Sequence, residues 1–255
     1  MAVAAVTGSA SGIGAAVRAR LERDGFDVIG VDLRDAEVEA DLSKAEGRAS
    51  AVRSVLDRCG GTLDRAVACA GLGSNVRPPS LIASVNYFGV VEVLDGLLEA
   101  LIRGSQPAAV AMVSNSAQMA PLEDSPFVAA MLDHDEGEAR RIIDEMDSPI
   151  VAYLGSKHAL GRAVRRRVRK WGDARVRLNG VCPGPVDTPL LRATRDDPTT
   201  RATIENIDIP IGRFGETADV ASLVGFLLGP EASWIHGSIV YVDGGNDAEI
   251  RPDRY

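Results

Sequence analysis

Short apolar, β-branched runs alternate along the chain with longer segments in which apolar residues recur at helical spacing. This alternation is typical of a parallel sheet with helices on both faces. Strands are predicted at residues 3–6, 27–31, 38–40, 65–69, 109–114, 175–181 and 238–242. Helices are predicted at 12–24, 44–58, 81–103, 152–171 and 217–228. The pattern therefore predicts an α/β protein with a Rossmann-type, doubly wound parallel sheet of about seven strands.

Two connections depart from this alternation. Residues 32–40 are too few for a crossover helix, which normally takes about a dozen residues, so a loop is predicted there. Residues 115–150 are long for a connection and include a helical pattern at 136–146. A small helical insertion is predicted here, before the helix that carries Tyr153, as a lid or a partner surface. Residues 1–255 are predicted to form a single domain with a C-terminal tail at 246–255.

The composition narrows the function classes. A chain of 255 residues, 45% of them hydrophobic, is long enough to bury a sizeable core. Its net charge of −8 argues against a nucleic-acid or anionic-membrane partner. No signal-peptide pattern and no span of the apolar length that a bilayer requires is found, so a cytoplasmic protein without a membrane partner is predicted. The three cysteines and three histidines lack metal-ligand spacing, so no metal is predicted.

The first candidate site is a glycine-rich turn between the first predicted strand and helix, Thr7-Gly8-Ser9-Ala10-Ser11-Gly12-Ile13-Gly14. A helix N-terminus at this point presents free N–H groups and the positive end of its dipole to an anion. Glycine has no Cβ, which permits a tight turn and the close approach of a pyrophosphate. The turn predicts a dinucleotide site; the alternative is a glycine-rich turn without a ligand.

Asp32 ends the second predicted strand, where a carboxylate accepts hydrogen bonds from the ribose hydroxyls of an adenosine. Its charge repels a 2′-phosphate, and the glycine turn has no Lys or Arg to offset that repulsion. NAD is therefore predicted over NADP. Two alternatives stay open, because Arg34 is near enough in sequence to reach a 2′-phosphate and a solvated turn aspartate is common.

Tyr153 and Lys157 are four residues apart in a predicted helix, so their side chains lie on one side, one turn from each other. A phenol has a pKa of about 10 and moves protons at neutral pH only if that pKa is lowered, which an adjacent ammonium does. Beside a dinucleotide site, the pair predicts an acid/base group at a nicotinamide. The same spacing also arises by chance in many proteins.

Together these motifs resemble the short-chain dehydrogenase/reductase family from about residue 3 to 245. The matching segments are Thr7-Gly8-x-x-x-Gly12-x-Gly14, Asp41-Leu42, Cys69-Ala70-Gly71, Asn86, Ser114, Tyr153-x-x-x-Lys157 and Asn179-x-x-x-Pro183-Gly184. The insertion, the short second crossover and the ending Asp243-Gly244-Gly245 … Arg251-Pro252 look most like the bacterial 3α-hydroxysteroid dehydrogenase/carbonyl reductase subgroup. The resemblance implies one dinucleotide-binding and catalytic domain and an NAD(H)-dependent oxidoreductase that interconverts a secondary alcohol and a ketone.

The resemblance also implies a role for each matching residue. Tyr153 would exchange a proton with the substrate oxygen, and Lys157 would hold the ribose hydroxyls and lower the pKa of Tyr153. Ser114 would hydrogen-bond the substrate oxygen, and Asn86 would anchor a water that links Lys157 to solvent. Asp41 would accept from the adenine amino group. The implied cofactor-binding residues are Gly8, Ser11, Gly12, Ile13, Gly14, Asp32, Asp41, Leu42, Ala70, Gly71, Tyr153, Lys157, Pro183, Gly184, Val186 and Thr188.

Several of these assignments have alternatives. Ser116 rivals Ser114, because alternation along a strand points both side chains the same way; Ser114 is favoured because it closes an apolar run. Asn86 is otherwise an ordinary satisfied helix side chain. Cys69 stands where the family more often has asparagine, so a packing role is predicted for it. The basic run at 162–170 is predicted as a solvated or subunit-facing surface.

The substrate is predicted where Ser114, Tyr153 and the loop after Thr188 converge. The candidate walls are apolar: Met119, Pro121, Phe127, Met131, Leu132, Pro185, Leu190 and Leu191. No Arg or Lys is placed to bind a carboxylate or phosphate, so a bulky apolar substrate is predicted, such as a 3α-hydroxysteroid or an aromatic carbonyl compound. The walls from the insertion alternatively form the core of a lid. The natural substrate, its stereochemistry and the direction of flux stay open.

Two other functions are open: a non-catalytic dinucleotide-binding sensor or scaffold, and a reductase of the same fold with another substrate. The presence of all four candidate catalytic residues argues against the scaffold. The family usually pairs through the helices that contain Asn86 and Tyr153. The insertion is expected to obstruct that face, so a homodimer is predicted rather than a tetramer.

Overall fold

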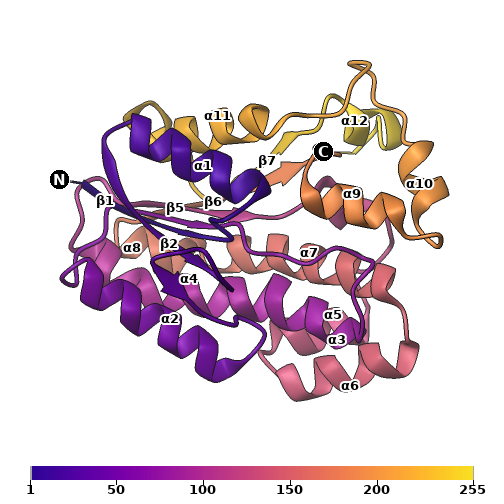
Figure 1. Cartoon of the computed structure of the whole chain (residues 1–255), viewed down its shortest axis with the longest axis horizontal. Helices are drawn as coiled ribbons and strands as arrows, with labels where there is room; N and C mark the ends of the chain where they lie inside the picture. Colours follow the sequence, from indigo (N-terminus) through magenta and orange to yellow (C-terminus); the bar gives the residue numbers. More distant parts are fainter. Residues whose placement is uncertain (1, 255) are drawn as a thin grey trace.

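Within residues 2–254, which a computed structural model describes, seven strands form one parallel sheet in the order β3-β2-β1-β4-β5-β6-β7 (Figure 1). The strands are β1 (Ala2–Thr7), β2 (Phe26–Asp32), β3 (Val38–Glu39), β4 (Arg65–Ala68), β5 (Ala108–Met112), β6 (Arg177–Pro183) and β7 (Ile239–Val242). The predicted single-domain α/β architecture is confirmed. The predicted loop between β2 and β3 is also confirmed, since no helix separates these two strands.

Helices cover both faces of the sheet (Figure 1). The elements that carry or surround the site are α1 (Gly12–Arg23), α2 (Ala45–Arg58), α3 (Pro79–Ala83), η1 (Ser84–Phe88), α4 (Gly89–Ile102), η2 (Asn115–Gln118), α5 (Pro126–Leu132), α6 (Glu136–Met146) and α7 (Pro149–Arg166). The remaining ones are α8 (Val168–Asp173), α9 (Pro189–Asp196), α10 (Arg201–Glu205), α11 (Thr217–Leu228), η3 (Pro230–Ala232) and α12 (Asn246–Ile250). Helices α1 and α11 lie on one face, and α2, α4 and α7 lie on the other.

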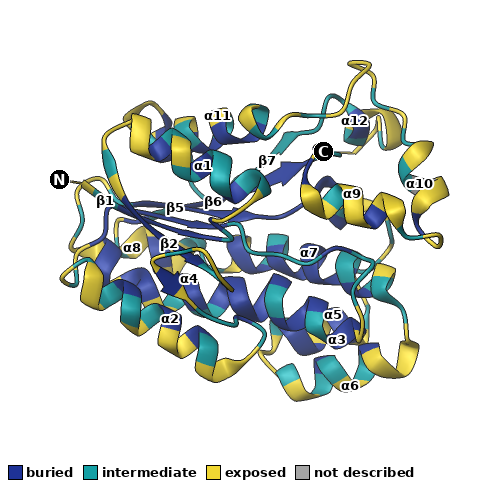
Figure 2. Ribbon diagram, in the orientation of Figure 1, coloured by how far each residue is buried: buried dark blue, intermediate teal, exposed yellow. Residues whose placement is uncertain are grey.

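Alternation along each strand supplies both cores, because successive side chains point to opposite faces. In β5, Ala108, Val110 and Met112 pack into the cluster that includes α1 and α11. Ala109 and Ala111 pack into the cluster that includes α2, α4 and α7. Figure 2 shows the result, a buried sheet between helices whose inner faces are buried and whose outer faces are exposed.

Two predicted long helices are interrupted. The helix predicted at 81–103 begins at Pro79 and contains the π-helical turn η1, which carries Asn86. The helix predicted at 152–171 begins at Pro149, because proline favours the first helical position and the Ser148 hydroxyl accepts from Val151 N at 3.4 Å. Hydrophobic spacing runs through both interruptions, so periodicity alone did not locate them.

The helical stretch Pro79–Ile102 corrects the prediction that no segment is long and apolar enough to cross a bilayer. This stretch of 24 residues is long and apolar enough to cross a bilayer by length and composition alone. However, 72% of its most apolar window is buried inside the fold. The apolar residues of α4 pack in the core cluster shared with α2 and the sheet. Core burial accounts for the composition of this helix.

The insertion contains more helix than predicted. It holds two helices, α5 and α6, where the sequence indicated only 136–146, because α5 is too short to show a clear period. The insertion packs against α3 and α7: Asp144 accepts from Ser80 N at 3.0 Å, and Arg140 donates to the Ser84 hydroxyl at 3.0 Å. Phe127 is fully buried beside Gly155, where a Cβ would lie 2.8 Å from the ring.

The predicted C-terminal tail is partly structured, because α12 covers Asn246–Ile250. The buried Asn246 side chain donates to the Asp208 carbonyl at 2.6 Å and accepts from Asn115 at 2.8 Å. Asn115 directly follows Ser114, so the end of the domain is tied to the end of β5. The sequence pattern did not predict this short helix, nor α9 and α10, because these segments are mostly polar.

Candidate active site

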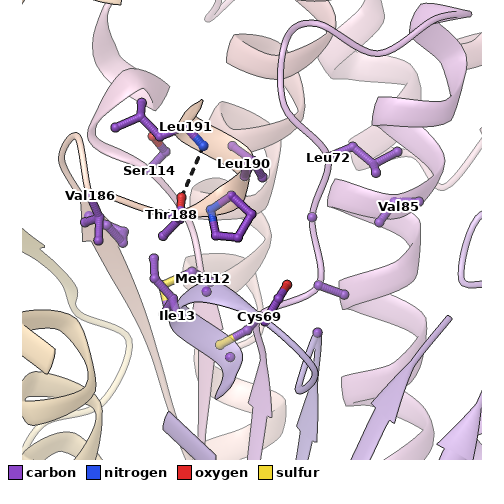
Figure 3. A pocket seen from close by; sticks show the side chains of 18 of the residues that line it. Ile13, Cys69, Leu72, Val85, Met112, Ser114, Val186, Thr188, Leu190 and Leu191 are labelled. Atoms are coloured by element: carbon purple, nitrogen blue, oxygen red, sulfur yellow. Dashed lines mark hydrogen bonds between the residues drawn. The ribbon is translucent and has the colours of Figure 1, made fainter. Parts of the chain in front are cut away.

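A cleft of about 280 Å³ lies at the carboxyl ends of the parallel strands. It is centred where the strand order reverses, between β1 and β4, which is the place where doubly wound sheets bind ligands. In Figure 3, Leu72 and Val85 lie on one side of the cleft, across from Thr188 and Leu190. The topology alone therefore locates a binding site.

The glycine turn forms the floor of this cleft at the start of α1. An added Cβ at Gly14 would lie 2.0 Å from the Gly8 carbonyl oxygen, so only glycine permits the first turn of α1 to pack this closely on β1. Ala70 N donates to the Thr7 hydroxyl at 3.1 Å, which holds the ends of β1 and β4 together. The result is a helix N-terminus that faces an open cleft, which suits a pyrophosphate.

Asp32 lines the cleft at the end of β2, as predicted. Its carboxylate accepts from Ala10 N at 3.0 Å and from Leu33 N at 2.7 Å, so it also braces the glycine turn. The side chain is therefore fixed rather than a freely solvated turn aspartate. Its orientation keeps a negative charge beside the position predicted for the adenosine ribose.

Asp41 and Leu42 line the same end of the cleft. The Asp41 carboxylate accepts from the Ser43 hydroxyl at 2.6 Å and pairs with Lys44 at 2.9 Å. These two hydrogen bonds, that of Ser43 first, hold the pKa of Asp41 below its ordinary range. The carboxylate is thus an anionic acceptor at neutral pH, as the predicted adenine contact requires.

The catalytic candidates meet at the other end of the cleft, which Ser114, Tyr153 and Lys157 all line. Ser114 follows β5 and caps η2; its hydroxyl accepts from Ser116 N at 3.2 Å and from the Ser116 hydroxyl at 2.8 Å. With both acceptor positions used, the one hydrogen of Ser114 is free to be donated toward Tyr153 or a substrate oxygen. Ser116 is therefore a support for Ser114 rather than its rival.

The prediction that Lys157, aided by an oxidised nicotinamide ring, lowers the pKa of Tyr153 concerns the cofactor-bound site and stays a prediction. Burial raises the pKa of Tyr153, and the hydrogen bond of Ser114 opposes that rise only in part. Lys157 donates from Nζ to the Met112 carbonyl at 2.8 Å, and burial lowers its pKa to about 8. In the protein alone, desolvation is the largest cause of the shift for both groups.

Asn86 does not line the cleft but supports its wall. Its side-chain oxygen accepts from Leu72 N at 2.7 Å, and its side-chain nitrogen donates to the Leu72 carbonyl at 3.0 Å. The side chain is therefore satisfied within the protein, which matches the structural alternative. The predicted water anchored by Asn86 stays a prediction. π-Helical turns such as η1 recur at functional sites.

Every cofactor-binding residue predicted from the sequence lines the cleft. The residues that line the cleft but were not predicted as part of the site are Leu33, Ala40, Cys69, Leu72, Val85, Met112, Val113 and Pro189. Most of them follow a strand or neighbour a predicted residue, and that position was the available signal. Cys69 packs partly against the core and burial raises the pKa of its thiol to about 12, so the predicted packing role fits.

The predicted substrate walls divide into two groups. Pro185, Leu190 and Leu191 line the cleft. Phe127 and Met131 are fully buried in the insertion, so their assignment as walls was wrong and the alternative of a packed insertion core is correct. Met119 is exposed and, like Pro121 and Leu132, lies outside the cleft lining.

The basic run at 162–170 belongs mainly to the surface. Arg169 is exposed and pairs with Asp173, whereas Arg167 is half-buried and holds Asp95 of α4 at 2.7 Å. Residues on successive positions of a helix point around it rather than along one stripe. This distribution agrees with a solvated surface and not with one continuous basic groove.

Comparison with known proteins agrees with this geometry. Residues 8–247 match the family described as enoyl-(acyl carrier protein) reductase. The chain is 43% identical to the 3-alpha-hydroxysteroid dehydrogenase/carbonyl reductase of Comamonas testosteroni, over all of both chains. It is 30% identical to the coniferyl-alcohol dehydrogenase of Pseudomonas sp. (strain HR199 / DSM 7063), over 94% of each.

A solved structure of a relative has the same fold over its full length. The 3-alpha-hydroxysteroid dehydrogenase of Pseudomonas sp. B-0831, determined with NADH, superposes with a TM-score of 0.98 at 48% identity and full coverage of both chains. The resemblance predicted from the motifs is thereby confirmed. The chain belongs to the short-chain dehydrogenase/reductase family.

Proposed function

We propose that the protein is an NAD(H)-dependent oxidoreductase that interconverts a secondary alcohol and a ketone on a bulky apolar substrate, such as a 3α-hydroxysteroid or an aromatic carbonyl compound. The observation that carries the proposal is the convergence of Ser114, Tyr153 and Lys157 at one end of a cleft whose other end is built for a dinucleotide. The names of the two full-length relatives, a hydroxysteroid dehydrogenase/carbonyl reductase and a hydroxysteroid dehydrogenase with NADH, support it.

The cofactor fits the residues present. The α1 N-terminus would hold the pyrophosphate, Asp32 the adenosine ribose, and the 183–188 segment the nicotinamide end. When bound, the nicotinamide supplies or accepts the hydride. Asp32 favours NAD over NADP, since its carboxylate is fixed in place by Ala10 and Leu33.

Side chains of the protein transfer the proton to or from the substrate oxygen. The Ser114 hydroxyl accepts from the backbone N–H and the hydroxyl of Ser116, so its own hydrogen is available to bind the substrate oxygen and orient it toward Tyr153. Tyr153 would then give its phenolic proton to a ketone oxygen or take the proton of an alcohol. Lys157, whose lowered pKa of about 8 eases proton exchange near neutral pH, is the neighbouring group able to restore that proton.

The apolar walls define the substrate class. Pro185, Leu190 and Leu191 line the cleft, and no Lys or Arg other than Lys157 is among the described lining residues. A neutral, bulky substrate loses little by entering such a site, whereas a carboxylate or phosphate would leave its charge unpaired. The matching family description names a carbon–carbon reductase, but the four-residue Tyr–Lys spacing favours carbonyl chemistry.

The test is NADH formation from a 3α-hydroxysteroid with NAD⁺, with NADP⁺ measured in parallel. We expect turnover with NAD⁺ and at least tenfold lower kcat/KM with NADP⁺, because the fixed Asp32 carboxylate repels a 2′-phosphate. Preference for a small charged substrate would contradict the substrate class. NADH binding without turnover of any alcohol or ketone would favour the sensor instead.

We also propose a homodimer. The family usually pairs through the helices that contain Asn86 and Tyr153, and the insertion packs on α3, η1 and α7, which belong to those two helical segments, so it covers part of that face. We expect light scattering on the purified protein to give twice the chain mass of 26.9 kDa. A tetramer would contradict this assignment. The cytoplasmic location and the absence of membrane or nucleic-acid partners stay predictions.

A further inference from the structure

Arg48 of α2 is a charged side chain with 1% exposure, and it is not among the residues that line the cleft. Its Nε donates to Glu92 of α4 at 2.7 Å, and its two terminal nitrogens donate to the carboxylate of Glu136. The guanidinium also lies 6.0 Å from the ring centroid of Phe88 in η1. One buried group thus joins α2 to the continuous η1–α4 segment and to α6, and α6 belongs to the insertion.

The same guanidinium has a further acceptor. Arg48 Nη1, which donates to Glu136 at 3.3 Å, also donates to the main-chain carbonyl of Leu42 at 3.3 Å. Leu42 is buried and lines the cleft next to Asp41, at the end proposed for adenine. A contact of the insertion therefore extends, through one rigid side chain, to the backbone of the adenine loop.

The planar geometry of guanidinium makes this contact directional. Its five N–H groups form a rigid fork, so two carboxylates that bind Nε and the terminal nitrogens fix the plane and aim Nη1. Glu92 binds Nε, and Glu136 binds the two terminal nitrogens. Buried ion pairs add little to stability on balance, so geometry is the better account of why a buried arginine stands here.

We propose that Arg48 is a positioning residue through which the insertion sets the shape of the adenine end of the cleft, so that docking of α6 raises the affinity for the cofactor. The inference rests on the proposed function, because it assumes a dinucleotide in the cleft. Glu136 is the insertion's contribution: without it, the guanidinium is held on one side only and Leu42 loses a directed donor. The catalytic end, built from Ser114, Tyr153 and Lys157, is not in contact with Arg48.

The test compares Glu136→Gln with Glu138→Gln. Glu138 is on the same helix, but it pairs with Arg141 at the surface, 2.7 Å away, and does not contact Arg48. Binding of NADH and of ADP-ribose is titrated directly for each variant, and kcat is measured at saturating cofactor. We expect Glu136→Gln to raise both dissociation constants about tenfold with kcat within twofold, and Glu138→Gln to change neither. Arg48→Lys, which keeps the charge but not the fork, is expected to behave like Glu136→Gln.

The outcomes separate the alternatives. Unchanged dissociation constants in folded Glu136→Gln and Arg48→Lys, even with a lower melting temperature, would show a merely structural role and overturn the inference. A loss of kcat as large as the loss of cofactor affinity would also overturn the inference, because it would indicate general damage to the cleft. Wild-type protein that binds neither NADH nor ADP-ribose would overturn the proposed function itself, and the inference with it.

Discussion

Tyr153→Phe is expected to lower kcat by about 10³-fold or more while NADH still binds, because the change removes the phenolic proton and leaves the ring. Tyr153 lines the cleft beside Ser114, and burial raises the pKa of its phenol, so at neutral pH it holds the proton that a ketone oxygen needs. The measurement is steady-state reduction of a 3-ketosteroid with NADH, together with a titration of NADH binding.

Tyr241→Phe is the matched control. Tyr241 of β7 loses only a 3.3 Å contact with Arg251 on this change and lies outside the cleft lining, so kcat is expected to stay within twofold. If Tyr153→Phe kept more than a tenth of the wild-type kcat, another group would have to supply the proton. Loss of NADH binding in that variant would show instead that the substitution had disturbed the cleft.

Lys157→Met is expected to abolish turnover and yet make the protein more stable. Burial lowers the pKa of Lys157 from 10.5 to about 8, so the folded state binds the proton less tightly than the unfolded state does. That difference costs about 3 kcal/mol of folding free energy at neutral pH. Losing the hydrogen bond to the Met112 carbonyl takes back about 1 kcal/mol. The net gain of about 2 kcal/mol corresponds to a melting temperature about 4–8 °C higher.

The stability difference between Lys157→Met and wild type is expected to depend on pH. Below pH 8 the lysine is charged in both states and the full cost of the buried ammonium is present. As the pH rises from 8 toward 10.5, the folded state loses the proton first, so wild-type stability recovers relative to the variant. The difference between the two unfolding free energies is therefore expected to narrow over that range. Lys170→Met, at an exposed position, is the control, with a change within about 0.5 kcal/mol at all pH values. A Lys157→Met variant less stable than wild type at pH 7 would contradict the argument.

The sheet and the cofactor end of the cleft could be predicted from the sequence because each depends on local pattern. Strand alternation in β5 fixes which side chains face which helices, and glycine spacing at Gly8 and Gly14 is readable without contacts. Asp32 was found because it ends a strand. All of these are positions along the chain rather than relations between distant segments.

The predictions that the structure corrected depend on the three-dimensional surroundings of a residue. Phe127 and Met131 are apolar, and their sequence cannot say whether they face a cleft or the core of the insertion; packing on α7 decides it. The pKa of Tyr153 depends on desolvation, which the Tyr–Lys spacing does not reveal. The supporting role of Ser116 became clear only because the backbone leaves the strand at Met112 and turns into η2.

The packing of Phe127 on Gly155 couples the sequence of the insertion to that of the catalytic helix. Gly155 stands between Tyr153 and Lys157, and a side chain there would collide with the buried ring at 2.8 Å. A chain that carries this insertion is thereby confined to glycine at the centre of its catalytic motif. In a chain without the insertion no Phe127 ring would stand against this position, so the steric requirement for glycine inside the catalytic motif comes from the insertion.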